Sequence, residues 1–150
     1  MRKFITFCPC LFLIVLFLHT ASAQVPDTLR EGIEQYQKEN YEEAIEILTK
    51  VRSERPASSQ AAFFLGMAYK QTMDYPKAAH NLQEAVTLAP PVREALVELI
   101  DTLSQLNKLE EAKKWLETAE KIDLFPARVS FLKGLILAKE NNHQGSIQAF

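Results

Sequence analysis

Apolar and polar residues follow a helical period along residues 27–150. One helix face is marked at positions i, i+3, i+4 and i+7 by Ala62, Leu65, Gly66 and Tyr69. The same spacing recurs within residues 44–51 and, more sparsely, within residues 112–119. No stretch shows the sustained alternation that is typical of a strand. The pattern therefore predicts an all-α fold of short helices.

A ten-residue phrase recurs every 34 residues. Its copies are ENYEEAIEIL at 39–48, MDYPKAAHNL at 73–82, NKLEEAKKWL at 107–116 and a blurred NNHQGSIQAF at 141–150. A fixed period of this length is typical of repeats that each fold as one supersecondary unit. Pro56 and Pro90 should end second helices, because proline cannot continue a helix. We predict one domain, 24–150, of about seven to eight helices, with antiparallel pairs at 25–58, 59–92, 93–126 and an incomplete 127–150.

Small and large residues alternate on the same 34-residue lattice. A glycine inside a helix costs about 1 kcal/mol relative to alanine, so a repeated one indicates a close approach between helices. The glycines should lie where the first helix of a unit meets its second, with the alanines opposite and the leucines filling the core. The predicted packing residues are Gly32, Gly66 and Gly134, Ala44, Ala78 and Ala112, Leu48, Leu82 and Leu116, and Tyr69. Ile100 replaces the glycine of the third unit, which should therefore pack wider or with a shifted helix.

Residues 1–23 have the layout of a secretory signal peptide. Arg2 and Lys3 give a positive start, an apolar run covers residues 4–18, and Ala-Ser-Ala at 21–23 is a small-residue cleavage signal. We predict cleavage after residue 23 and a periplasmic or secreted protein with no stable membrane span. The alternative is an uncleaved membrane anchor, although the apolar run is shorter than the roughly 20 residues that a spanning helix needs.

The remaining residues show no pattern of catalytic or metal-binding chemistry. Both cysteines, Cys8 and Cys10, lie in the leader, and neither His80 nor His143 has a metal-ligand spacing. The net charge is −2, and it becomes −4 once the two basic residues of the leader are removed. That charge offers no basic surface for nucleic acid. We expect no cofactor, no metal, no nucleic-acid partner and no enzymatic activity.

These motifs resemble the tetratricopeptide repeat (TPR) family, and the likeness covers nearly all of residues 27–150. The second unit fits the family pattern best, through Leu65, Gly66, Tyr69, Ala78, Leu82, Ala85 and Pro90. The first unit has Glu31 and Gln35 where leucine and tyrosine are usual, and the fourth keeps little besides Gly134. The resemblance implies a right-handed α-α superhelix whose first helices line a concave face that binds peptides.

Candidate groove residues follow from that resemblance. The columns that would face the groove hold mostly apolar residues, with glutamine and lysine farther along each first helix. The candidates are Phe63, Met67, Lys70, Gln71, Asp101, Phe131 and Leu135. The Lys/Asn clamp with which some family members hold a terminal carboxylate is missing, although Lys70 could meet an acidic group. The alternative is that the apolar residues, including Leu29, Ile33 and Val97, only pack between neighbouring first helices.

Three functional hypotheses remain open at this point. The leading one is an exported, non-enzymatic scaffold that binds a peptide or protein segment in the concave groove. The second is an N-terminal TPR module of a larger exported enzyme or regulator whose effector domain lies beyond residue 150. The third is self-association through the open end of the solenoid. The fourth unit stops at Phe150, a core column, and solenoids need polar caps, so we expect either a longer protein or a poorly held last helix.

Overall fold

The computed structural model describes residues 27–149, so the predicted leader lies outside the described residues. The described residues form eight α-helices and no strand. Their bounds are α1 Asp27–Gln37, α2 Tyr41–Glu54, α3 Ser59–Gln71, α4 Tyr75–Thr87, α5 Glu94–Gln105, α6 Leu109–Lys121, α7 Pro126–Lys139 and α8 His143–Ala149. None of the helices in this part of the chain is long and apolar enough to cross a membrane.

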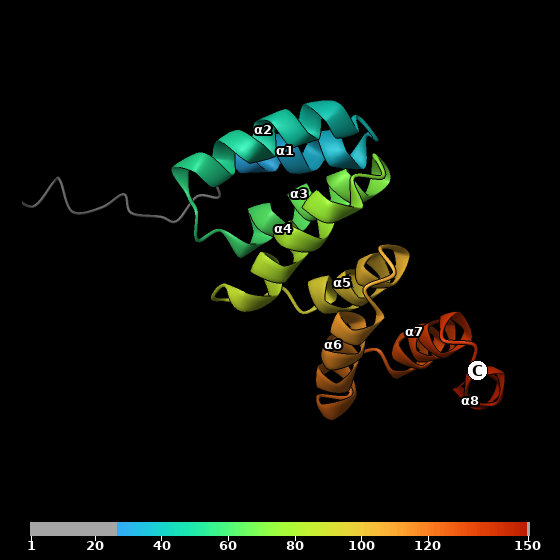
Figure 1. Cartoon of the computed structure of the whole chain (residues 1–150). Coiled ribbons are helices and arrows are strands. Elements are labelled where there is room, and N and C mark those ends of the chain that lie inside the picture. Colours follow the sequence, from blue (N-terminus) through green and yellow to red (C-terminus); the bar gives the residue numbers. More distant parts are fainter. Residues whose placement is uncertain (1–26, 150) are drawn as a thin grey trace, which may run out of the picture.

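Consecutive helices pair and the pairs follow one another as a right-handed solenoid (Figure 1). The first helix of each repeat packs against its own second helix and against the second helix of the preceding repeat. First helices of adjacent repeats also contact each other, as α1 with α3, α3 with α5 and α5 with α7. No pair of second helices is in comparable contact. The first helices therefore lie closer together and form the inner, concave side.

Each turn from a first to a second helix is built in the same way. A residue with positive φ follows the first helix in all four repeats, at Glu39, Met73, Asn107 and Asn141. In the second repeat, the amide of Asp74 donates to the carbonyl of Tyr69 at 2.9 Å and that of Met73 to Lys70 at 3.1 Å. These two bonds define a Schellman motif, and the other three repeats have the same pair. The 34-residue lattice thus includes the backbone conformation of the turns.

The close approach of the paired helices depends on the glycine column. A Cβ atom on Gly66 would lie 2.8 Å from Cγ of Leu82, and one on Gly32 would lie 2.8 Å from Cγ of Leu48. The leucine of the second helix therefore fills the space that glycine leaves, where we expected the alanine column. Ile100 is fully buried, and α6 diverges from α5 more than α4 does from α3 (Figure 1).

The apolar core runs along the solenoid in two clusters that meet in α3. The smaller cluster belongs to the first repeat and one face of α3, and the larger extends from α3 to α7. The alanine and leucine columns are buried in every case: Ala44, Ala78, Ala112, Leu48, Leu82 and Leu116. Gly134 is buried as well, and Tyr69 is half-buried against the smaller cluster. The core therefore positions the first helices and leaves their inner faces for other contacts.

Candidate functional site

The inner face of α3 combines apolar residues with two polar ones. Phe63 and Met67 are half-buried and pack against the larger core cluster. One helical turn farther on, Lys70 is half-buried and Gln71 is exposed. The residues at 63, 67, 70 and 71 share one side of α3 because they are spaced by three and four. Two of the candidates therefore contribute to packing as well as to the groove.

The amino group of Lys70 lies between two carboxylates of the next first helix. Its Nζ atom is 2.6 Å from Oε2 of Glu98 and 2.6 Å from Oδ2 of Asp101, both on α5. Glu98 is the more deeply buried, with 8% of its surface exposed. Arg128 of α7 donates to the other oxygen of the same carboxylate. Glu98 therefore joins three consecutive first helices across the concave face.

The pKa of Lys70 reflects these contacts. Burial alone would lower the pKa of this amine, because a low-polarity surrounding disfavours the charged form. The hydrogen bonds to Asp101 and Glu98 act in the opposite direction and together raise the pKa above its ordinary value. The lysine is thus fully protonated at neutral pH, and its charge is already compensated by two carboxylates.

Glu98 and Arg128 were not among the residues predicted from the sequence. Glu98 stands within the apolar run Ala95–Ile100, where an acidic residue must be hydrogen-bonded or paired if it is buried. That was a usable signal for a buried charge. The sequence gave no indication that the partners would come from both neighbouring repeats.

The inner face of α7 carries an apolar pair flanked by two cations. Phe131 is 52% exposed, and Leu135 is half-buried against the core. Arg128 precedes them and Lys139 follows them on the same stripe, where the Lys139 amino group donates to the main-chain carbonyl of Ser104 on α5. The phenyl ring of Phe131 is the largest apolar group that the described first helices expose on this face.

The inner face of α1 is mostly occupied by packing. Leu29 is buried, Ile33 is half-buried, and on α5 Val97 is fully buried. Tyr36 packs its ring edge-on against Phe64 at 5.6 Å. Burial, partly offset by a hydrogen bond with Gln71, raises the pKa of the Tyr36 hydroxyl. These residues connect the first two repeats and leave the accessible part of the face to α3, α5 and α7.

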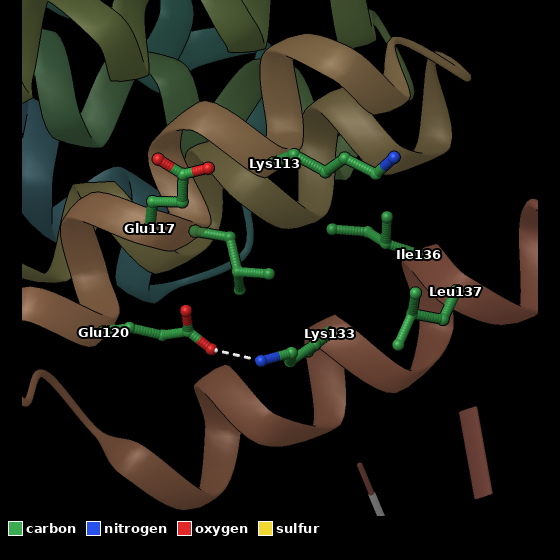
Figure 2. A pocket seen from close by; sticks show the side chains of 7 residues that line it. Lys113, Glu117, Glu120, Lys133, Ile136 and Leu137 are labelled. Atoms are coloured by element: carbon green, nitrogen blue, oxygen red, sulfur yellow. Dashed lines mark hydrogen bonds and ion pairs between the residues drawn. The ribbon is translucent and has the colours of Figure 1, made fainter. Parts of the chain in front are cut away.

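A separate pocket lies between α6 and α7, away from the candidate residues. Its volume is about 270 Å³, and it is lined by Leu116, Ile136, Leu137, Lys113, Lys133, Glu117 and Glu120. Figure 2 shows Lys133 reaching across the pocket to Glu120, with an Nζ to Oε1 distance of 2.9 Å. Within the described residues, no group of three histidine, cysteine or acidic side chains is placed to hold a metal ion.

Comparisons with known proteins agree with the repeat pattern. Sequence profiles described as tetratricopeptide repeat match residues 29–93 and residues 71–136, which together span well over half of the chain. A comparison with curated protein sequences found no match.

Several solved structures have the same fold. One MamA crystal structure has a TM-score of 0.75 at 21% identity, with 82% of this chain and 67% of that chain covered. MamA from Desulfovibrio magneticus RS-1 has a TM-score of 0.73 at 22% identity, with 82% of this chain and 70% of that chain covered. MamA of strain MSR-1 has a TM-score of 0.72 at 21% identity and covers 82% and 71%. At such identities the likeness concerns the fold.

Proposed function

Because the chain belongs to the tetratricopeptide repeat family, we propose that it is a non-enzymatic scaffold that binds a peptide or protein segment on its concave face. The observation that carries this proposal is the half-exposed ring of Phe131 beside Leu135 on the inner face of α7. Exposed apolar groups on a concave surface are typical of sites that receive a partner. Met67 and Phe63 continue the apolar surface on α3.

The charges of the groove indicate which peptides would bind. Lys70 is held by Glu98 and Asp101, and Arg128 is held by Glu98. A peptide carboxylate would have to displace an existing carboxylate to reach either cation, which costs more than it returns. We therefore propose apolar anchors as the recognised feature, with Gln71 available for hydrogen bonds to the peptide main chain.

A library of random peptides displayed on phage tests the groove. Selection against the purified protein should enrich peptides with a recurrent pair of apolar residues. The substitution Phe131→Ser should weaken their binding by about tenfold or more, which is the loss of about 1–2 kcal/mol expected for an anchor residue. Binding should be unchanged when the peptide C-terminus is amidated, because no free cation awaits a carboxylate.

Met73→Ser is the matched control for this test. Met73 is 74% exposed but lies in the turn after α3, so its replacement removes an equally accessible apolar group from another place. Both variants should keep the melting temperature of the parent. Equal binding by Phe131→Ser and the parent protein, or the same loss in both variants, would show that the groove is not the site.

We also propose that the protein is exported and acts in the periplasm or outside the cell. The support is the order of a basic start, an apolar run and small residues within 1–23. Expression of the full chain in a bacterium with a Sec pathway should give a mature protein whose N-terminus, determined by mass spectrometry, is Gln24. An intact N-terminus in the membrane fraction would favour the anchor instead.

A further inference from the structure

The junction between the third and fourth repeats departs from the lattice of the others. We call the contact of α6 with α7 the 3/4 joint and the contact of α4 with α5 the 2/3 joint. In the 2/3 joint, three lattice positions hold Ala79, Val86 and Leu99. Ala79 and Leu99 are buried, and Val86 packs against the larger core cluster. The 2/3 joint is therefore closed by apolar side chains at all three positions.

The same three positions are charged in the 3/4 joint. Moving 34 residues along the chain replaces them with Lys113, Glu120 and Lys133. Their side chains are 36%, 40% and 46% exposed, and the pocket of about 270 Å³ lies among them. Buried apolar contact between the helices is reduced to a strip that includes Leu116 and Ile136.

Charged contacts span the 3/4 joint instead. Lys133 of α7 pairs with Glu120 of α6, and Lys113 of α6 pairs with Glu140 just after α7. Arg128 and Lys139 of α7 bond to the Glu98 carboxylate and the Ser104 carbonyl of α5. The fourth repeat, residues 127–150, contains three basic residues and only Glu140 as an acid, whereas residues 93–126 are predominantly acidic. The two repeats therefore attract each other by opposite charge.

We propose that the 3/4 joint is an electrostatic joint that loosens as ionic strength rises, while repeats one to three stay folded. In a solenoid each repeat contacts only its neighbours, so a weaker interface localises opening to one side of it. Exposed ion pairs are screened by salt, and apolar contacts are not. The 3/4 joint should thus respond to salt in a way that the 2/3 joint does not.

The joint has a consequence for the groove, and this part rests on the proposed function. Phe131 and Leu135 are on α7, on the far side of the joint from Phe63 and Met67. Loosening would separate the two apolar halves of the concave face. The groove would then hold an apolar peptide best at low ionic strength, against the usual trend for apolar binding.

Hydrogen–deuterium exchange measures the joint without any ligand, so its outcome is independent of the groove. The purified protein would be compared in about 0.1 M and about 1 M NaCl, over which the screening length falls from ~10 Å to ~3 Å. We expect amides of α7 and α8 to exchange at least about tenfold faster in high salt, equivalent to roughly 1.4 kcal/mol. Amides of α3 and α4 serve as the internal reference and should change little. Equal responses in both regions, or no response in α7, would refute the joint.

Variants identify the residues responsible. The triple substitution Lys113→Ala, Glu120→Val and Lys133→Leu installs the residue types of the 2/3 joint, and it should abolish the salt response of α7. The single reversal Glu120→Lys should accelerate exchange in α7 already at low salt, and adding Lys133→Glu should restore protection. The charge exchange decides the matter even if the triple variant misfolds. Failure of the double variant to recover would contradict an electrostatic joint.

A control removes an ion pair elsewhere in the solenoid. Lys77→Gln breaks the exposed pair of Lys77 with Asp74 at 2.8 Å in the second repeat. This variant should retain the full salt response of α7, because the pair does not span a repeat junction. A loss of the response in this control would mean that surface charge in general, and not the 3/4 joint, governs exchange.

Discussion

Four single residues determine how each repeat turns back on itself. Glu39, Met73, Asn107 and Asn141 all have positive φ angles, between 58° and 64°. Asparagine tolerates this conformation well, whereas other side chains are disfavoured there. Two of the turns thus have a suitable residue, and two carry a local conformational cost. The Schellman hydrogen bonds on either side hold all four in the same geometry.

Replacing Met73 with asparagine should stabilise the protein. The substitution relieves the left-handed strain and removes a side chain that is 74% exposed, so no packing is lost. We expect an increase in the free energy of unfolding of about 0.5–1 kcal/mol, measured by urea denaturation. Ile122→Asn is the control, because Ile122 is also exposed at a helix end but has a φ of −101°. A similar gain in the control would mean that relief of backbone strain is not the cause.

At the residue scale, side-chain columns could be predicted and backbone conformations could not. The leucine and alanine columns were recognisable because hydrophobicity and size repeat every 34 residues. The turn residues also lie on the lattice, but methionine and glutamate at those positions carry no signal of positive φ. The partner of the glycine column was misassigned for a related reason. Sequence spacing gives the facing helix, whereas the side chain that enters the gap depends on the crossing geometry.

At the scale of helices, α5 has the largest share of the charged contacts on the concave face. Glu98 and Asp101 receive Lys70 from one neighbour, and Glu98 also receives Arg128 from the other. Arg52 and Glu84 form a further pair between α2 and α4 at 2.7 Å. These pairs fix the register between adjacent repeats, because a shift of one helical turn would separate the charges.

Replacing Lys70 with methionine should destabilise the protein although it preserves the length of the side chain. Glu98 is buried, and it would lose one of its two cations and keep a carboxylate neighbour in Asp101. We expect a loss of about 1–3 kcal/mol in the free energy of unfolding at neutral pH. Lys77→Met, which breaks an exposed pair, should cost much less. Equal losses in the two variants would show that the Lys70 cluster has no special role.

The same cluster gives a pH dependence with a defined sign. The pKa of Lys70 is raised in the folded protein above the ordinary value of 10.5. A raised folded pKa contributes stability below 10.5, and the contribution is lost as pH rises through the folded pKa. The difference in stability between the parent protein and Lys70→Met should therefore be constant from neutral pH to about pH 10. It should shrink only at more alkaline pH.

The helices and their pairing were predictable, and part of the candidate site was not. Periodicity and proline positions predicted the helix pairs that the structure contains. Phe131 and Gln71 were selected from the inner columns, and the structure places both at the surface of that face. The exposure of each apolar candidate depends on how neighbouring first helices approach one another, and a single helix does not encode that distance. Lys70 likewise acquires its carboxylate partners only through the neighbouring repeat.

At the scale of the whole molecule, the first repeat explains its departures from the family pattern. Glu31 is exposed on α1, and Gln35 accepts a hydrogen bond from the side chain of Asn40 at 2.8 Å. In the second repeat, the corresponding positions are Leu65 and Tyr69, which pack against the first repeat. The outer side of α1 has no preceding repeat within the described residues, so polar residues there face water. The first repeat thus has the polar outer face of a capping repeat.

The neighbour-only contacts of the solenoid also set the speed at which it can fold. Every pair of helices in substantial contact belongs to the same repeat or to adjacent repeats, so few contacts require distant parts of the chain to meet. Helical proteins with such local contacts fold in microseconds to milliseconds, faster than proteins that depend on long-range strand pairing. Because the apolar 2/3 joint lies in the middle of the chain, structure can start there and spread outward to both ends. A polypeptide emerging into a new compartment would acquire its shape repeat by repeat, without waiting for its last residues.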